Sequence, residues 1–349
     1  MRIAYISHVD SRWIKQRPQF LAEALVDKRT RVSFVCSSIV RRRSLVRDQG
    51  LAVPVVRVPL LPQSLRSKLR CFESTAAFVS ALMIVLRVRP RAVIVTHVRH
   101  LSLARVLRAW GIDVYYDCMD LNSLFVDSIG RDSSDEFDLV SLCEKVFCSS
   151  LRIEEHIRLL DSDAKVISVT NGLDPLSFVH PESSGLVQPL SVGYVGTVSS
   201  WFDFEVVLAL LEAKPEISVT ICGPVDIDIP THARIHFLGI LPHSEAVAAM
   251  NQCSVLVLPF RLTDLVQAVD PVKVYEYVAT GRPVVAVKYD QLEHFGDLIH
   301  RYSSKTEFVT QVSELVSAPR LVEDVRLRFI EENSWSKRAE TVRREITEC

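Results

Sequence analysis

Residues 270–285 read DPVKVYEYVATGRPVV, and this stretch specifies a short helix followed by a buried strand. Pro271 can open the helix and Gly281 can close it, because proline suits the first helical turn and glycine suits the position after the last one. Pro283 then starts an apolar strand, where its missing N–H is harmless. The stretch therefore indicates one repeat of an alternating α/β fold.

The beginning of this helix is suited to an anion. A helix N-terminus offers free N–H groups and a partial positive charge, which favour phosphate. Lys273 lies in the first turn, where a cation opposes the helix dipole, so a bound anion is the simplest reason for its presence. Glu276 lies one turn further on the same face, and its carboxylate can accept two hydrogen bonds from a ribose diol. The alternative is an ordinary Lys–Glu pair on the surface.

The same alternation continues on both sides of this stretch. Strand-like runs occupy Arg2–Ile6, Arg31–Cys36, Val53–Val58, Ala92–Thr96, Val114–Asp117, Val146–Cys148, Val166–Val169, Leu190–Val195, Ile217–Cys222, Arg234–Leu238, Val255–Leu258 and Val284–Val287. Helical patterns fill several of the intervals, for example Leu101–Trp110 and Asp203–Ala213. Strands that are apolar on both faces and alternate with helices predict parallel sheets.

The chain is expected to form two domains, because 349 residues exceed the usual size of one. The pattern breaks in a segment rich in proline and serine, which we interpret as a linker at 179–189. We therefore predict an α/β protein with two Rossmann-like, doubly wound domains, 1–178 and 190–333, facing across a cleft. Ligands of such sheets bind at the carboxyl ends of the strands.

Composition excludes some functions for the chain as a whole. The formal net charge is −1, so no general affinity for polyanions or nucleic acid is expected. Basic residues nevertheless cluster in the first domain: Arg41, Arg42, Arg43, Arg47, Arg66, Lys68, Arg70, Arg87, Arg89 and Arg91. These residues form either a solvated surface, which we favour, or a face for a membrane or an anionic acceptor.

Cysteine usage and the N-terminal sequence predict a cytoplasmic protein. Eight cysteines occur without any CxxC pair. Cys36, Cys148 and Cys222 end apolar strands, where a thiol acts as a small buried hydrophobe, so we expect reduced cysteines and neither disulfides nor a zinc site. The first residues run straight into a strand and lack the apolar segment of a signal peptide.

The stretch 270–285 resembles the donor-binding signature of GT-B glycosyltransferases, P-x-K-x-x-E-Y-x-A-x-G-x-P-V-V. The likeness is closest to bacterial members of the group 1 type that build exopolysaccharide and teichuronic polymers. It implies that Glu276 binds the nucleotide ribose, that Lys273 faces the pyrophosphate, and that Tyr275 belongs to the donor site. Many relatives carry a second acidic residue eight positions before this glutamate, where this chain has Ala268. The difference argues against the common retaining subgroup.

Further loops of the second domain are similar to this family. Gly196 and Thr197 follow a strand, where the glycine allows close backbone approach and the threonine can donate to phosphate. Gly223 and Leu238 match two further donor loops, the second near the nucleotide base. Residues 169–174, VTNGLD, match the family's segment at the domain crossing, although a simple Asn-Gly turn is favoured there. Residues 334–349 resemble the family's last helix, which crosses back to the first domain.

The first domain is expected to hold the acceptor. Residues 11–20, SRWIKQRPQF, join the first strand to the first helix and resemble the same bacterial subgroup. They would place Trp13 and Arg17 at the mouth of the cleft, although Trp13 could equally be a packed loop aromatic. His97 closes the fourth strand on the same side, where a lone histidine is more often structural.

A base is expected at the end of the fifth strand. An acceptor hydroxyl needs a positioned base to attack an anomeric carbon, and Asp117 or Asp120 can supply one. The resemblance favours Asp120, whose alternative role is to cap the next turn. No metal-ligand spacing is convincing, and the pair Asp226 and Asp228 is interpreted as incidental.

We expect a metal-independent, inverting glycosyltransferase of the hexosyltransferase kind that needs no cofactor. It would move a sugar from a nucleotide-diphosphate donor, a UDP-sugar above all, to a sugar, a lipid-linked sugar or another hydroxyl acceptor. Two alternatives stay open: a nucleotide-sugar epimerase on the same fold, and a non-catalytic nucleotide-sugar-binding partner subunit. The epimerase would lack an acceptor surface, and the binder could dispense with Asp120.

Overall fold

The computed structural model describes residues 1–38, 50–60, 70–121, 132–178 and 190–348. The predicted linker at 179–189 and the basic residues Arg41, Arg42, Arg43, Arg47, Arg66 and Lys68 lie outside these ranges. The chain forms two compact units. Unit 1 comprises Met1–Thr170 and Trp335–Cys349, and unit 2 comprises Asn171–Ser334.

The described part of unit 1 contains a parallel sheet in the order β3-β2-β1-β4-β5-β6-β7. Its strands are β1 (Arg2–Ile6), β2 (Arg31–Ser37), β3 (Val55–Val58), β4 (Ala92–Val95), β5 (Asp113–Cys118), β6 (Lys145–Cys148) and β7 (Val166–Ser168). The helices with defined bounds are α1 (Arg17–Ala24), α3 (Arg70–Val88), α4 (Leu101–Ala109), α5 (Asp132–Leu142), α6 (Leu151–Leu160) and α13 (Trp335–Thr347), with a short 3-10 helix η1 (Val98–His100).

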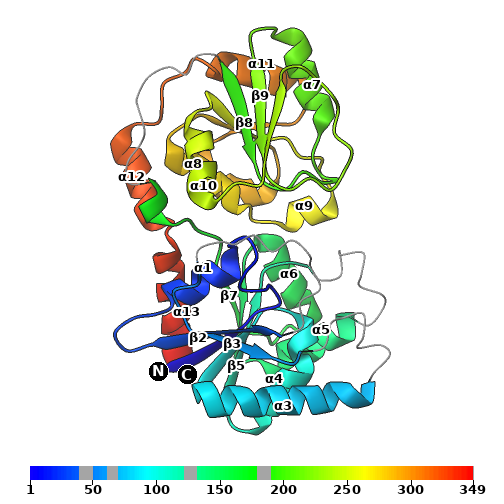
Figure 1. Cartoon of the computed structure of the whole chain (residues 1–349), viewed down its shortest axis with the longest axis vertical. Helices are drawn as coiled ribbons and strands as arrows, with labels where there is room; N and C mark the ends of the chain where they lie inside the picture. The colour runs from blue at the N-terminus through cyan, green and yellow to red at the C-terminus, as the bar shows by residue number, and fades with distance from the viewer. Residues whose placement is uncertain (39–49, 61–69, 122–131, 179–189, 349) are drawn as a thin grey trace. The chain divides into compact units, whose positions relative to one another are not determined.

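The sheet of unit 1 reverses its order between β1 and β4, so its helices cover both faces (Figure 1). On one face, α1 and α13 pack on alternate side chains of the central strands, such as Ile3, Tyr5 and Phe34. The ring of Trp335 stacks on that of Phe20 with centroids 5.5 Å apart, which joins the last helix to the first. Helices α3 and α4 pack against each other elsewhere on the sheet.

The described part of unit 2 holds a second parallel sheet, in the order β10-β9-β8-β11-β12-β13. Its strands are β8 (Ser191–Val195), β9 (Ser218–Cys222), β10 (Ile235–Gly239), β11 (Val255–Leu258), β12 (Val284–Val287) and β13 (His300–Tyr302). Its helices are η3 (Pro175–Phe178), α7 (Phe204–Ala213), α8 (His243–Asn251), α9 (Asp264–Ala268), α10 (Val272–Thr280), η4 (Asp290–Leu298), α11 (Lys305–Leu315) and α12 (Glu323–Glu332).

These two parallel sheets confirm the predicted α/β class with two doubly wound domains. The alternation in the sequence located the strands within one or two residues, except for β13, which it missed. Helices α5 and α9 were also not predicted. In the part of the chain that the structure describes, no helix is long and apolar enough to cross a bilayer.

Candidate functional site

The order of the unit 2 sheet fixes where a ligand can bind. The strand order reverses between β8 and β11, and open parallel sheets bind ligands at such a switch point, beyond the carboxyl ends of the strands. Gly196 directly follows β8, and Gly223 directly follows β9. Helix α10 follows β11 and supplies Lys273 to the same place. The predicted donor residues Gly196, Gly223 and Lys273 therefore come together.

Both glycines have backbone conformations that side chains rarely adopt, with φ of 151° at Gly196 and 140° at Gly223. A Cβ on Gly223 would collide with the backbone of Gly196, so glycine is required where the two loops meet. A Cβ on Gly196 would lie 2.5 Å from Lys273 Nζ. The site is thus lined by bare backbone close to an ammonium group, which suits the approach of a phosphate.

Helix α10 begins and ends as its sequence predicts. Pro271 is its N-cap, and Gly281 closes it in the left-handed conformation with φ of 75°. Lys273 lies in the first turn, where its ammonium makes a 3.2 Å hydrogen bond to the Tyr194 hydroxyl. The ammonium also lies 5.0 Å from the ring centroids of Tyr194 and Phe260.

The environment of Lys273 disfavours its charge. Burial lowers the pKa of this lysine to about 8, and Glu276 offsets part of that effect. Among the described residues, no carboxylate lies within ion-pair distance of the Lys273 ammonium. A cation held by a hydroxyl and two aromatic faces, at a helix N-terminus, gains most from an anionic ligand.

Glu276 has a partner that the sequence did not reveal. Its Oε1 lies 2.7 Å from Nε2 of His243, the first residue of α8. Because a carboxylate only accepts, the imidazole donates through Nε2. The other ring nitrogen lies 3.5 Å from the Ser177 hydroxyl. Only 9% of Glu276 is exposed, so His243 fixes the direction of a nearly buried carboxylate.

The other residues predicted for the donor site differ in their exposure to solvent. Leu238 lies next to the last residue of β10 with 46% of its surface exposed, and Thr197 is half-buried. Tyr275, by contrast, is completely buried, and its hydroxyl bonds to Asp270 and His294. The predicted contact between Tyr275 and the donor is therefore corrected, because the ring points into the core and serves to hold Asp270.

Asp270 organises the segment in front of α10. Both it and Asn171 are buried, and the Asn171 backbone N–H donates to the Asp270 carboxylate over 2.6 Å. The Asn171 side chain also donates to the Asp270 carbonyl, and Gln291 donates to its carboxylate. Burial raises the pKa of Asp270 in spite of these donors. The VTNGLD segment is thus a structural support of the residues that precede helix α10.

In unit 1, Asp117 is a buried ion-pair residue. Its carboxylate lies 2.8 Å from Arg17 Nη2 and also accepts a hydrogen bond from the Tyr5 hydroxyl. Arg17 in turn donates to the Thr170 carbonyl and is only 3% exposed. Neither side chain is open to a substrate, so the prediction of Asp117 as a substitute base and of Arg17 as a cleft-lining residue is corrected.

Asp120 has the environment of a base. It lies two residues beyond the end of β5 and is half-buried. Desolvation raises the pKa of Asp120 to about 6, with Asp117 adding to the effect and Arg17 opposing it. A carboxylate poised near neutrality is suited to take a proton from a hydroxyl.

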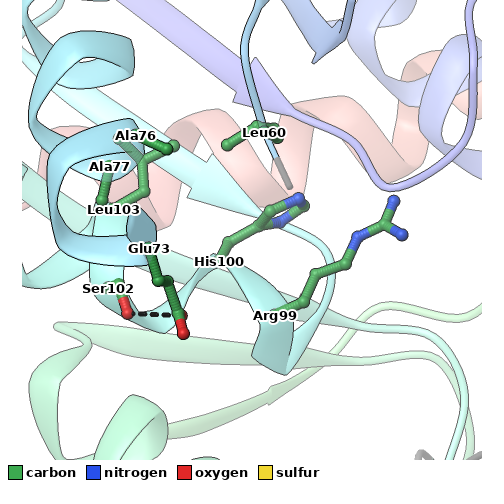
Figure 2. Close-up of a pocket in the computed structure, with 8 residues that line it drawn as sticks. All are labelled: Leu60, Glu73, Ala76, Ala77, Arg99, His100, Ser102 and Leu103. Atoms are coloured by element: carbon green, nitrogen blue, oxygen red, sulfur yellow. Dashed lines mark hydrogen bonds between the residues drawn. The ribbon is translucent and has the colours of Figure 1, made fainter. Parts of the chain in front are cut away.

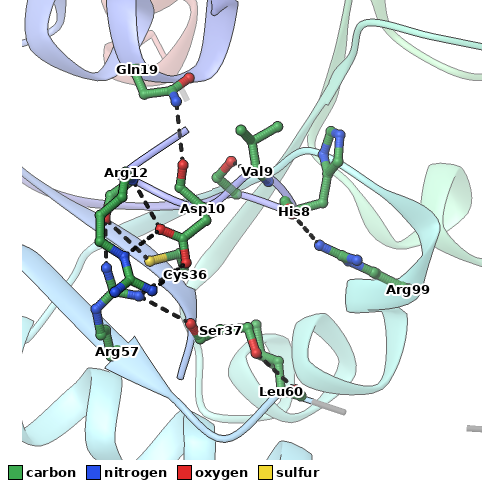
Figure 3. A network of polar contacts seen from close by, with 12 residues as sticks. His8, Val9, Asp10, Arg12, Gln19, Cys36, Ser37, Arg57, Leu60 and Arg99 are labelled. Atoms are coloured by element: carbon green, nitrogen blue, oxygen red, sulfur yellow. Dashed lines mark hydrogen bonds and ion pairs between the residues drawn. The ribbon is translucent and has the colours of Figure 1, made fainter. Parts of the chain in front are cut away.

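The loops after β1 and β4 meet at the switch point of the unit 1 sheet. The rings of His8 and His97 lie 5.1 Å apart, and His8 Nδ1 lies 2.8 Å from the Thr96 hydroxyl. Arg99 donates to the His8 carbonyl, as Figure 3 shows. Burial, and then His97 and Arg99, lower the pKa of His8 well below its usual value. His8 is therefore a neutral imidazole at this edge, and the sequence did not single it out.

The loop after β1 is held by a polar network (Figure 3). Arg57 bonds to Asp10, to the Ser37 carbonyl and to the Ser11 hydroxyl, while Arg12 also pairs with Asp10. Trp13 lies in the same loop, and its backbone N–H donates to the Asp10 carbonyl. These contacts order the predicted acceptor loop.

A small pocket beside α3 is too small for a sugar. Glu73, His100 and Leu103 are among the residues that line it, and Ser102 donates to Glu73 over 2.7 Å (Figure 2). Its free volume is about 20 Å³, which is room for roughly one water. Within the described ranges, no group of three or more His, Cys, Asp or Glu side chains could hold a metal.

Comparisons with known proteins show similarity over part of the sequence and over nearly the whole fold. Residues 205–344 match the family described as Glycosyl transferase-like. A relative from Bacillus subtilis, named "Putative teichuronic acid biosynthesis glycosyltransferase TuaH", is 25% identical over 203 residues. That match spans 51% of this chain and 51% of the relative, so the chain spans about half the length of the curated relative.

Solved structures agree over the whole chain. Sucrose-phosphate synthase from Thermosynechococcus elongatus has a TM-score of 0.72 at 14% identity, covering 99% of this chain and 98% of that one. HepE from Anabaena, in complex with UDP, has a TM-score of 0.66 at 13% identity, covering 100% of both chains. At such identities the likeness shows the fold, which is GT-B. Over residues 205–344 the chain is therefore similar to the Glycosyl transferase-like family, and its fold is that of the GT-B glycosyltransferases.

Proposed function

We propose that the chain transfers a hexosyl group from a UDP-sugar to a hydroxyl of a sugar or lipid-linked acceptor, by inversion and without a metal. The observation that carries the proposal is the Lys273 ammonium at the N-terminus of α10, beside Gly196 and Gly223, without a carboxylate in ion-pair contact among the described residues. HepE, a solved protein of the same fold, is in complex with UDP, which supports this class of donor.

The proposed donor site has two parts. The bare backbone at Gly196 and Gly223 and the first turn of α10 accommodate the diphosphate, and Lys273 neutralises its charge. Glu276, oriented by His243, accepts hydrogen bonds from the ribose hydroxyls. Because leaving-group charge grows during the reaction, Lys273 and the helix N-terminus stabilise the departing diphosphate.

The proposed chemistry is a single displacement. Asp120 takes the proton of the acceptor hydroxyl as its oxygen bonds to the anomeric carbon. The bond from that carbon to the diphosphate oxygen breaks in the same step, and its electron pair leaves with UDP, which departs as the trianion. Ala268, at the position where many retaining relatives have an acid, supports inversion. The donor is the substrate, and the proposal includes no cofactor or resident metal.

Location and partners belong to the same proposal. The described cysteines Cys36, Cys118, Cys143, Cys148, Cys222 and Cys253 are free, which supports a reducing, cytoplasmic setting. The predicted partners are the nucleotide sugar and the hydroxyl acceptor, and nucleic acid is not among them.

Three measurements test the proposal. Calorimetry with UDP should show binding that Lys273→Ala weakens by about 1.5–3 kcal/mol, the worth of a hydrogen bond to a charged group. NMR of the product should show an inverted anomeric centre, and a product with retained configuration would remove the inverting mechanism. Turnover should continue in EDTA; loss that manganese or magnesium restores would remove metal independence.

The alternative functions are separated by comparing wild type with Asp120→Asn. Donor hydrolysis or transfer that falls in the variant fits a glycosyltransferase. An epimerised donor formed without an acceptor identifies the epimerase, and UDP binding without turnover in either protein identifies the non-catalytic binder.

A further inference from the structure

A hollow at the amino edge of the unit 1 sheet is lined mainly by basic side chains. Strands β1 and β2 start there, and the loop between α1 and β2 borders it, at the end of unit 1 that carries the N label in Figure 1. Its volume is about 370 Å³, which is within the range of small-molecule sites. The residues that line it are Met1, Arg2, Asp27, Lys28, Arg29 and Arg31.

Two of these arginines lie where like charges repel each other. Arg2 and Arg31 are register partners at the starts of neighbouring parallel strands, so their side chains leave the sheet on the same face. Like charges directly opposite each other destabilise a sheet. Lys28 and Arg29, in the adjoining loop, add two more positive charges. A negative group bound among these side chains would remove the repulsion.

The carboxylate in this lining is already engaged by other groups. Asp27 Oδ1 accepts the backbone N–H groups of Arg29 over 2.7 Å and of Thr30 over 2.6 Å. Asp27 Oδ2 lies 3.3 Å from Arg343 Nε on α13. The hydrogen bond from the Arg29 backbone, and then those from Thr30 and the charge of Arg343, lower the pKa of Asp27. This carboxylate therefore holds its own loop and the last helix, and it leaves the four basic side chains unmatched.

The four basic side chains are exposed and uncompensated. In the part of the chain that the structure describes, no side chain or carbonyl forms an ion pair or hydrogen bond with the charged groups of Arg2, Lys28, Arg29 and Arg31. A guanidinium presents its donors in a planar fork that matches a phosphate with two hydrogen bonds. Several positive charges around one hollow attract a multivalent anion more strongly than a single carboxylate. The chemistry of the lining therefore favours phosphate groups.

We propose that this hollow binds a small soluble anion that carries two phosphoryl groups. Arg2 and Arg31 hold the anion from the strands, and Lys28 and Arg29 hold it from the loop. Because the loop is tied to α13 through Asp27, the bound anion also stabilises the packing of the last helix on unit 1.

The hollow is separate from the site proposed for glycosyl transfer. Strand β1 has five residues, which place the amino edge about 16 Å from the carboxyl edge at roughly 3.3 Å per residue. His8 and the candidate base Asp120 lie beyond the carboxyl ends of their strands, so an anion in the hollow touches neither. The proposal therefore stands independently of the proposed function.

The test uses inorganic pyrophosphate as the probe and the full chain. Hydrogen exchange at residues 27–31 should slow when pyrophosphate is added, both in wild type and in Lys273→Ala. Calorimetry is done in the Lys273→Ala chain, where the proposed donor site is weakened. There, the further pair Arg2→Gln, Arg31→Gln should lower the affinity for pyrophosphate by about tenfold or more, because each change removes a hydrogen bond between charged groups. Added salt should weaken the binding.

A matched control exists on the same chain. The pair Arg87→Gln, Arg328→Gln removes two exposed arginines that lie outside the hollow, so it should leave the affinity for pyrophosphate unchanged. Circular dichroism verifies folding, and Arg31→Gln alone replaces the double variant if that variant unfolds. Exchange at residues 271–276 reports separately on the donor site, so the two sites can fail independently.

Three results would overturn the proposal. One is hydrogen exchange at residues 27–31 that pyrophosphate leaves unchanged in wild type. Another is an affinity that the glutamine pair at the hollow does not lower, or that the control pair lowers equally, since general attraction to positive charge would then account for binding. The third is binding of long polyphosphate without binding of pyrophosphate, which would assign the arginines to an extended polyanion.

Discussion

His243→Ala tests whether the nucleotide site depends on the orientation of one carboxylate. The imidazole holds Glu276 Oε1 over 2.7 Å, and the Glu276 side chain is nearly buried. Without this donor, the carboxylate loses its fixed direction, and its bond to the ribose weakens. A hydrogen bond to a charged group is worth about 1.5–3 kcal/mol, and 32% of the His243 side chain is exposed, so we expect a loss of about 1–1.5 kcal/mol. That loss corresponds to an affinity for UDP about five- to tenfold lower.

The assay is calorimetric titration with UDP and with 2′,3′-dideoxy-UDP, which lacks both ribose hydroxyls. Because the effect passes through the ribose hydroxyls, His243→Ala should reduce affinity for UDP and leave that for the dideoxy compound nearly unchanged. His243→Gln, which keeps a donor, should restore part of the loss. His300→Ala, an exposed histidine on β13, is the control.

A double-mutant cycle completes the test. With Glu276→Gln in place, the further change at His243 should have little effect, because the two residues act on one contact. Equal losses for both nucleotides would assign His243 a general structural role and refute the positioning argument. Normal affinity in Glu276→Gln would refute the ribose contact itself.

Three further predictions concern the two units. A bound diphosphate must raise the pKa of Lys273 from about 8. Affinity for UDP should therefore be full below pH 8 and fall as the pH rises above it. In titrations between pH 7 and 9, Lys273→Arg should bind UDP with an affinity that does not change with pH. Turnover should rise with pH through about 6 as Asp120 ionises. Asp120→Asn should lower the rate by about a hundredfold to ten-thousandfold and retain the affinity for the donor. Near wild-type turnover in that variant would exclude Asp120 as the base. Trp335→Ala should destabilise unit 1 by about 3–5 kcal/mol in chemical denaturation, because it removes a buried ring stacked on Phe20; a loss confined to unit 2 would contradict this.

The local signals in the sequence were sufficient to predict the bounds of helix α10. Pro271 and Gly281 set its ends, and Lys273 is informative because a cation is unfavourable in a first turn. The glycines after β8 and β9 were recognisable because other residues rarely adopt the backbone conformations found there. Most strands were also predictable, because buried parallel strands are apolar on both faces.

The sequence did not predict the direction in which these side chains point. Asp117 and Asp120 both lie near the end of β5, yet one is sealed in an ion pair with Arg17 and the other is half-buried with a raised pKa. Tyr275 stands within the donor motif but points into the core. His243 reaches Glu276 from 33 residues away, a contact that depends on how α8 packs on α10. Strand β13 was missed because its residues, His300–Tyr302, lack the apolar run that marks the other strands.

Unit 1 begins the chain, but its last helix is synthesised only after all of unit 2. Unit 2 is one continuous stretch, Asn171–Ser334, whereas unit 1 is interrupted and receives α13 from residues that are translated after all of unit 2. During synthesis, unit 2 can therefore complete its sheet while the face of unit 1 that α13 covers is still bare. Domains usually mature from the N-terminus onward, but here the first to begin is the last to finish. A nascent chain stalled before Trp335 would expose the apolar side chains around Phe20 to chaperones.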